Sequence, residues 1–148
     1  MLLNADGVAS LLDTKDKGKK AQVGYDLALK SINKVNGGMV MKDKTTVFDY
    51  DEVTPFINDD GKFLYQLEPG TYSLTFEQGC KLDDKHTAFI ITSGVYDPGF
   101  EVDEMGGMLV ATETIVLEKG ARVAQIIMME NAEAELYDGQ WQKDKDKK

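Results

Sequence analysis

The feature that most constrains the fold of this chain is a succession of short apolar segments separated by turns. Pro69-Gly70, Pro98-Gly99 and Lys119-Gly120 interrupt the apolar runs of the second half. Proline fixes its own φ and glycine accepts a positive φ, so these pairs end one extended segment and reverse the chain before the next. The apolar runs cover residues 63–67, 71–76, 88–91, 108–111, 114–117 and 123–129. This pattern predicts an all-β fold, a sandwich or barrel with Greek-key or jelly-roll connections, and the unbroken run 88–91 predicts a strand buried on both faces.

The first half of the chain has a different pattern. Residues 4–13 space their apolar side chains as a helix does, and Asn4 is a suitable N-cap, so a short N-terminal helix is predicted. Apolar and polar residues alternate over 22–35, which predicts a strand. Asn36-Gly37-Gly38 then predicts a turn.

The length of 148 residues corresponds to about one domain. We expect a single β domain over residues 1–142. The remaining residues, 143–148, are charged and lack apolar side chains. They form either a disordered, solvated tail or a segment that binds phosphate groups.

Composition restricts the partners of this chain. Its net charge of −9 opposes binding to a nucleic acid polymer and would repel a polyphosphate unless a metal ion or local cations intervene. The single cysteine, Cys80, excludes an intrachain disulfide and fits residence in the cytoplasm without requiring it. With one cysteine and one histidine, a zinc site of the usual kind is not expected. The sequence contains neither an apolar stretch long enough for a transmembrane helix nor an N-terminal signal-peptide pattern, so no membrane association is expected.

The strand and turn at residues 94–102 contain the most informative polar residue. Asp97 follows an apolar strand and precedes Pro98-Gly99, and Phe100 follows the turn. The residue before a proline is biased toward an extended conformation, so Asp97 is expected at the end of a strand with Phe100 close to it. Two interpretations remain open on this spacing alone: an ordinary hairpin with an exposed carboxylate, or a carboxylate that activates water against a substrate containing a ring.

Three other segments extend this pattern. They are Ala21-Gln22-Val23-Gly24-Tyr25-Asp26-Leu27, then Leu67-Glu68-Pro69-Gly70-Thr71-Tyr72 with Glu77, and finally Gly120-Ala121-Arg122-Val123-Ala124-Gln125-Ile126-Ile127. In this order, on a β-rich chain of this length, the four segments resemble the dUTPase and dCTP deaminase superfamily. The resemblance covers residues 21–142. It implies a distorted jelly-roll subunit, a homotrimer with active sites at subunit contacts, and a deoxynucleoside triphosphate substrate with Mg²⁺.

The resemblance also implies roles for the hairpin residues. The aspartate of dUTPases that matches Asp97 positions or activates the water that attacks the α-phosphate, which gives dUMP and pyrophosphate. The aromatic residue that matches Phe100 packs on the deoxyribose and leaves no room for a 2′-hydroxyl. The backbone that matches Gly94, Val95 and Tyr96 reads the uracil edge.

On the strands, the resemblance implies that Asp26 is a partner of the metal ion or its water. It implies that Gln125 contacts the phosphates, and Arg122 lies where it would assist. Phosphoryl transfer needs charge neutralisation and positioning, and Mg²⁺ needs few protein carboxylates, so these roles are chemically consistent. Taken without the resemblance, Asp26 is equally well a local ion-pair partner, Arg122 a surface ion-pair partner and Gln125 a polar residue at a strand edge.

The C-terminal residues 137–142 resemble the deaminase tail that folds over the triphosphate. By this resemblance Tyr137, Gln140 and Lys143 are expected to contact the triphosphate. Trp141 is either part of that tail or an anchor at a subunit interface.

The chain departs from the family pattern at two places. The family has an Arg-Ser-Ser segment, which contacts phosphates, where Ile91-Thr92-Ser93-Gly94 joins two strands directly. Either phosphate binding differs here or a loop is missing from the sequence. The deaminase glutamate that activates water falls on Ala111, although Glu113, two residues later, would share a strand face with that position.

Three functions follow from these observations. The first is hydrolysis of dUTP by a homotrimer of the deaminase-like branch, since position 111 has no glutamate. The second is dCTP deamination, alone or combined with dUTP hydrolysis. The third is a catalytically silent trimer that binds a nucleotide or a protein partner.

Overall fold

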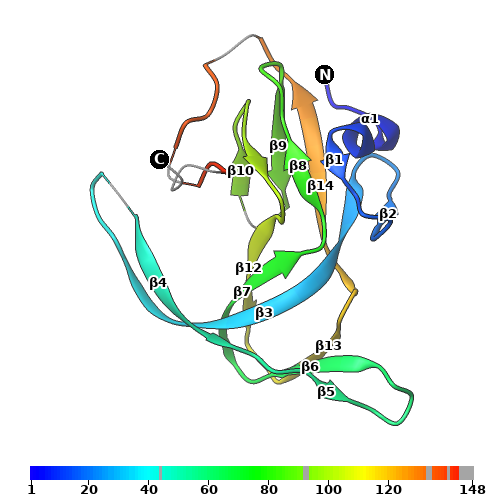
Figure 1. Ribbon diagram of the computed structural model, residues 1–148, viewed down its shortest axis with the longest axis vertical. Coiled ribbons are helices and arrows are strands. Elements are labelled where there is room, and N and C mark those ends of the chain that lie inside the picture. Colours follow the sequence, from blue (N-terminus) through cyan, green and yellow to red (C-terminus); the bar gives the residue numbers. More distant parts are fainter. Residues whose placement is uncertain (44, 92–93, 133–134, 140, 144–148) are drawn as a thin grey trace.

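The computed structural model describes residues 1–43, 45–91, 94–132, 135–139 and 141–143, and strands dominate these residues (Figure 1). The chain begins with α1 (Ala5–Ser10), β1 (Leu12–Asp13), β2 (Lys19–Lys20), β3 (Tyr25–Val40) and β4 (Thr45–Glu52). It continues with β5 (Phe56–Ile57), β6 (Phe63–Leu67), β7 (Gly70–Phe76), β8 (Gly79–Lys81) and β9 (His86–Ile90). The last strands are β10 (Gly94–Tyr96), β11 (Glu101–Val102), β12 (Gly106–Ala111), β13 (Ile115–Glu118) and β14 (Arg122–Glu130). The predicted all-β class with a short N-terminal helix is confirmed.

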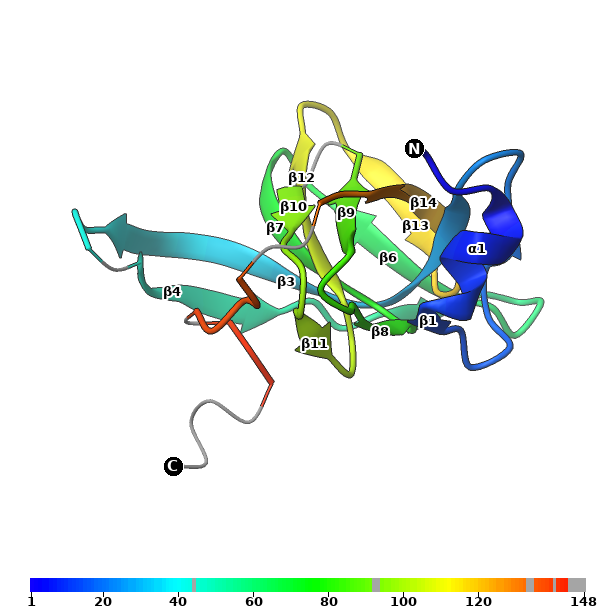
Figure 2. The same ribbon diagram turned by 90° about the horizontal axis from the view of Figure 1, so that it is seen from above.

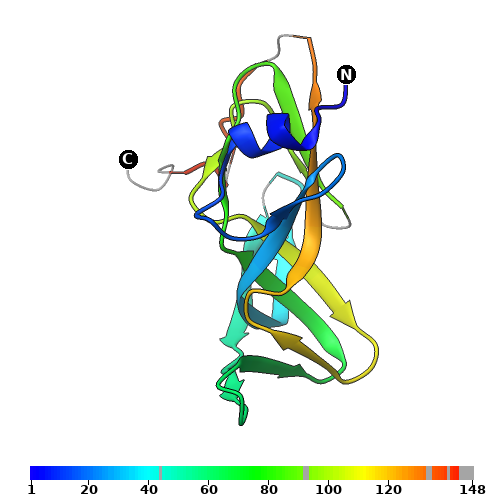
Figure 3. The same ribbon diagram turned by 90° about the vertical axis from the view of Figure 1, so that its right-hand side faces the viewer.

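The strands form one large and two small antiparallel sheets. The large sheet has the order β10-β9-β14-β3-β7-β12, and β2 and β4 also pair with β3. The small sheets are β1-β8-β11 and β13-β6-β5. The large sheet curls into a half-barrel (Figures 1 and 3), which brings its two end strands, β10 and β12, to the walls of one cavity.

Strand β3 is longer than predicted and extends with β4 as an arm away from the body (Figure 2). The turn predicted at residues 36–38 is wrong, because these residues continue β3. The register against β4 shifts on both sides of Gly37, between Val35 and Met39. Glycine in a strand often marks such a bulge, so the two glycines are accommodated within the ladder and the chain reverses only after Val40.

The helix α1 is shorter than predicted. The Asn4 side chain accepts a hydrogen bond from the Gly7 N–H at 2.9 Å, as expected of an N-cap, and Val8 is the buried residue of the helix. The helix ends at Ser10 because the next residues, Leu12–Asp13, pair with β8. No helix in the described part of the chain is long and apolar enough to cross a membrane.

The core lies between the curled sheet and the elements that cover it. It contains side chains from nearly every strand, and the largest fully buried apolar ones are Leu27, Leu29, Ile32, Leu67, Phe76, Met105, Ile126 and Met128. Strand β9 was predicted to be buried on both faces, but only Ala88 and Ile90 are buried, whereas Phe89 is half-buried. In this antiparallel sheet one face of β9 packs on the core, so the apolar run alone did not indicate its environment.

Replacing Phe76 by Ala should lower the free energy of unfolding by about 3–5 kcal/mol, because a fully buried ring is lost and a cavity remains. Urea denaturation followed by circular dichroism measures this. Phe56→Ala is the matched control, since Phe56 is 45% exposed on β5 and its loss should cost less than about 1 kcal/mol. Equal losses in the two variants would contradict this description of the core.

Candidate functional site

Asp97 is held by the turn that its local sequence predicts. The Phe100 N–H donates to the Asp97 carbonyl with an N···O distance of 3.1 Å, which closes the turn. Gly99 has φ +84°, a value that residues with a side chain rarely adopt. Its N–H donates to the Asp83 carbonyl at 3.0 Å and ties the turn to the neighbouring loop. The exposed Asp97 carboxylate therefore has a fixed position directly after β10.

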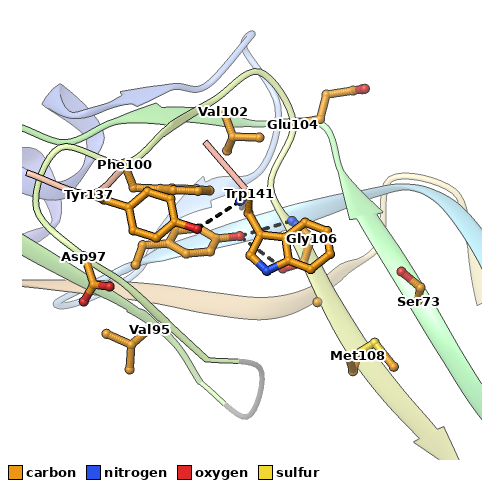
Figure 4. Close-up of a pocket in the computed structure, with 12 residues that line it drawn as sticks. Ser73, Val95, Asp97, Phe100, Val102, Glu104, Gly106, Met108, Tyr137 and Trp141 are labelled. Carbon is orange, nitrogen blue, oxygen red and sulfur yellow. Dashed lines mark hydrogen bonds between the residues drawn. The ribbon is translucent and has the colours of Figure 1, made fainter. Parts of the chain in front are cut away.

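A cavity of about 510 Å³ opens beside this turn (Figure 4). It lies where the half-barrel is not closed, between β10 and β12. Five predicted site residues line it together: Val95, Tyr96, Asp97, Phe100 and Tyr137. Gly94 does not line the cavity; it pairs with Ile90 at the start of β10.

Three aromatic rings stack along one side of the cavity. The centroids of Tyr96 and Phe100 are 4.4 Å apart, with an angle of 31° between the rings. Tyr137 meets Phe100 edge to face at a centroid distance of 5.2 Å. Phe100 is only 5% exposed, so in this conformation its ring is covered by the two tyrosines.

The covering Tyr137 belongs to a C-terminal segment, described at residues 135–139 and 141–143, that is attached to the Asp97 turn. The Tyr137 N–H donates to the Pro98 carbonyl at 2.7 Å. The Gln142 side chain makes two further bonds: its Oε1 accepts from the Glu101 N–H at 2.8 Å, and its Nε2 donates to the Gly99 carbonyl at 2.9 Å. This segment therefore packs on the turn of its own chain.

Lys143 was predicted to contact a triphosphate, and in the structure it faces carboxylates. Its Nζ lies 2.7 Å from Asp103 Oδ1 and 3.7 Å from Glu101 Oε1. A phosphate group would have to compete with these two residues for the ammonium group. The other predicted triphosphate contact of this segment, Gln140, and the tail residues 144–148 lie outside the described residues.

Asp26, Arg122 and Gln125 form a second group on the paired strands β3 and β14. Gln125 lies directly opposite Asp26, with 3.5 Å between Nε2 and Oδ1. The Arg122 guanidinium lies 3.9 Å from Asp26 Oδ2. The structure thus brings these predicted residues together, but none of them lines the cavity at Asp97.

The cavity also has walls that the sequence analysis did not identify. They are Ser73, Val102, Glu104, Gly106, Gly107 and Met108. Glu104 forms an ion pair with Lys30 at the cavity rim. Gly106-Gly107 immediately before an apolar run was a usable signal, because glycines in a strand often mark a close approach of another group. The remaining residues come from contacts between strands that no local pattern indicates.

The structure corrects the interpretation of Glu113. This residue does not share a strand face with Ala111, because β12 ends at Ala111 and Glu113 lies in an exposed bend before β13. Ala111 itself is buried, with 6% of its surface exposed. A shift of register therefore does not bring Glu113 to the predicted deaminase position.

The strands on either side of the junction that replaces the Arg-Ser-Ser segment pair with each other. β9 and β10 are antiparallel, with Gly94 opposite Ile90 and Tyr96 opposite Ala88. Thr92 and Ser93 lie outside the described residues. The two strand-like runs that meet abruptly in the sequence are thus neighbours in the sheet.

Two other reactive side chains, Cys80 and His86, do not line the cavity at Asp97. Burial raises the pKa of the Cys80 thiol to about 12, so a thiolate nucleophile is not available near neutral pH. His86 Nδ1 is 2.7 Å from Asp83 Oδ1 and so interacts with the loop behind the turn. Among the described residues, no three or more His, Cys, Asp or Glu side chains are grouped as a metal-binding cluster.

Comparison with known proteins gives two relatives in sequence. Both are named probable deoxyuridine 5'-triphosphate nucleotidohydrolase and come from two strains of Halobacterium salinarum. Each is 26% identical to this chain over 133 residues, which covers 80% of this chain and 80% of the relative. No protein-family model matches the chain.

Among solved structures, 2'-deoxycytidine 5'-triphosphate deaminase from Agrobacterium tumefaciens has a similar fold, with a TM-score of 0.62 at 14% identity. The similarity covers 86% of this chain and 47% of the deaminase chain, so the present chain spans about half the length of that protein. At this level of identity the similarity concerns the fold.

Replacing Gln142 by Ala should weaken the attachment of the C-terminal segment to the turn, because its two side-chain bonds to Glu101 and Gly99 are lost. The Glu101 amide loses its acceptor, so its hydrogen exchange, measured by NMR, should become about three- to tenfold faster, as expected for one hydrogen bond. Gln66→Ala is the control, because the Gln66 amide bonds the exposed Glu68 side chain away from the cavity. Unchanged exchange at Glu101 would contradict the hydrogen bond between the Glu101 amide and Gln142.

Proposed function

Given that the chain belongs to the dUTPase and dCTP deaminase superfamily, we propose that it is a dUTP nucleotidohydrolase, which converts dUTP into dUMP and pyrophosphate. The observation that carries this proposal is the position of Asp97, an exposed carboxylate on a fixed turn at the edge of a cavity of about 510 Å³. The names of the two Halobacterium relatives support dUTP as the substrate.

In this proposal Asp97 is the general base. Its carboxylate accepts a proton from a water molecule, and the water oxygen forms a bond to the α-phosphorus. The bond from that phosphorus to the bridging oxygen breaks, and pyrophosphate leaves. A base that is already held in position lowers the entropic cost of the step, and the hydrogen bonds of the Asp97 turn provide this restraint.

The cavity receives the uncharged part of the substrate. Its aromatic side, which includes Phe100, suits the deoxyribose, and the backbone of β10 and of Gly106-Gly107 suits the polar edge of uracil. Because Tyr137 covers Phe100, stacking of the sugar on Phe100 requires Tyr137 to move aside. The C-terminal segment then becomes available to close over the bound nucleotide.

The phosphates would meet the second group, Asp26, Arg122 and Gln125. Since this group does not line the cavity of its own chain, we propose that another copy supplies it, in a homotrimer with active sites between subunits. Each site would then combine the Asp97 hairpin of one subunit with the β3 and β14 strands of a second.

Asp26 fits a role with Mg²⁺. Mg²⁺ commonly keeps several waters and binds through one or two carboxylates together with substrate phosphates, so it does not need the larger cluster that the described residues lack. Asp26, half-buried on β3 beside Gln125, offers one such carboxylate. When bound there, the ion would offset the negative charge of the phosphates.

Deamination of dCTP is the second candidate, and the fold similarity to a dCTP deaminase favours it. The buried Ala111 and the position of Glu113 outside β12 disfavour it, because no glutamate lies where the deaminase resemblance requires one. A protein that binds nucleotides without turnover is the third candidate.

One assay separates these functions. The protein is incubated with Mg²⁺ and either dUTP or dCTP, and nucleotides, pyrophosphate and ammonia are measured. We expect dUMP and pyrophosphate from dUTP only. Release of ammonia from dCTP would show that the protein is a deaminase and contradict the proposal. Binding of nucleotide without any product would favour the third candidate, a protein that binds nucleotides without turnover.

Replacing Asp97 by Asn should lower kcat for dUTP by at least about 100-fold, because a positioned general base commonly contributes that much. Binding should change little, since Asn keeps the shape of Asp. Quenching of the single tryptophan, Trp141, which lines the cavity, measures nucleotide binding. Asp60→Asn, in the exposed turn after β5, is the control. Turnover that survives in Asp97→Asn would exclude Asp97 as the base.

A further inference from the structure

The two end strands of the large sheet face the same cavity without a ladder between them. β10 pairs with β9 on one side, and β12 pairs with β7 on the other, so each is the last strand of the hydrogen-bonded order among the described residues. Both strands line the cavity of about 510 Å³. The distance between its two walls therefore depends on side chains that connect β10 to β12.

Tyr96 makes such a connection. Its hydroxyl oxygen lies 3.3 Å from the carbonyl oxygen and 3.3 Å from the amide nitrogen of Gly106. A hydroxyl group has one proton to donate and lone pairs to accept, so it can bond both backbone groups of Gly106 at once. Both distances are at or beyond the long end of the normal range, so each bond is weak and the two act together. We refer to this pair of contacts as the Tyr96–Gly106 bridge.

Tyr96 also contacts the residues of the proposed site, so the position of its ring affects theirs. It stacks on Phe100 at 4.4 Å between centroids, and Asp97 is the next residue in the chain. Burial raises the pKa of Tyr96 to about 12, so the hydroxyl stays protonated near neutral pH and keeps its donor proton. A change in the bridge would therefore shift Phe100 relative to the glycine wall at Gly106.

We propose that Tyr96 is a positioning residue that controls sugar selectivity: the Tyr96–Gly106 bridge fixes the width of the cavity and holds Phe100 where it excludes a 2′-hydroxyl. This inference rests on the proposed function, in which Phe100 packs on the deoxyribose. Tyr96 itself acts through Phe100 and the backbone of β10.

The test is Tyr96→Phe, which keeps the ring and removes the hydroxyl. We expect the ratio of kcat/KM for dUTP to kcat/KM for UTP to fall about two- to threefold, the low end for a hydrogen bond, because both contacts of the hydroxyl are long. General destabilisation would not change this ratio, because it lowers the amount of active protein for both substrates alike. The matched control is Tyr65→Phe, which removes a hydroxyl bonded at 3.2 Å to the Lys30 carbonyl and should leave the ratio unchanged.

A second measurement does not depend on turnover. Hydrogen exchange of the Gly106 amide, measured by NMR without substrate, should be about two- to threefold faster in Tyr96→Phe than in the wild type and unchanged in Tyr65→Phe. If the wild type hydrolyses dUTP but the sugar selectivity of Tyr96→Phe is unchanged, the role of Tyr96 is refuted and the proposed function stands. If Gly106 exchange is unchanged, the bridge itself is refuted. If the wild type hydrolyses neither dUTP nor UTP, the proposed function fails, and with it the role in sugar selectivity.

Discussion

The arrangement of the site depends on the pairing of β14 with two neighbours at once, β9 and β3. Ile126 lies opposite Ile90 of β9 and is fully buried, so this pairing is part of the core. Side chains alternate between the two faces of a strand, so the preceding residue, Gln125, points to the other face. There it lies opposite Asp26. On its far side β9 holds β10, which leads into Asp97. This strand, which lies between β9 and β3, thus fixes both groups of polar residues, and it also keeps them apart within a single chain.

The cavity is a consequence of a sheet that curls without closing. Strand edges with unpaired backbone groups tend to bind other strands, and proteins usually cover or interrupt them. Here Tyr96 reaches from β10 to Gly106 of β12, and the C-terminal segment packs over the adjacent turn through Gln142. Full closure of the barrel would have filled this space with a backbone ladder. The incomplete closure leaves an aromatic cavity with polar backbone groups at its edges, which suits a planar, uncharged ligand group.

The sequence predicted the features that depend on neighbouring residues. The turn after Asp97 follows from Pro98 and Gly99, whose φ preferences hold whatever lies around them. The turn expected near Gly37 failed because pairing with β4 absorbed the glycines into a bulged strand, so a tertiary contact prevailed over a local preference. Gly106-Gly107 could be noticed in the sequence, but its meeting with β10 across the cavity and the cover on Phe100 were not predictable, because they depend on segments that meet only after the sheet curls.

Charge explains why the triphosphate is assigned to residues outside this cavity. Glu104 on its wall would repel phosphates, and the nearby Lys30 is already paired with Glu104, so the described wall residues offer no free cation for the phosphates beyond the one attacked next to Asp97. Lys143, in the C-terminal segment, likewise forms an ion pair with Asp103. A base and a sugar carry no charge and meet no such repulsion. In a chain with a net charge of −9, binding of a nucleoside triphosphate therefore favours a divided site, in which one surface holds the nucleoside and a metal ion or a second copy of the chain neutralises the phosphates.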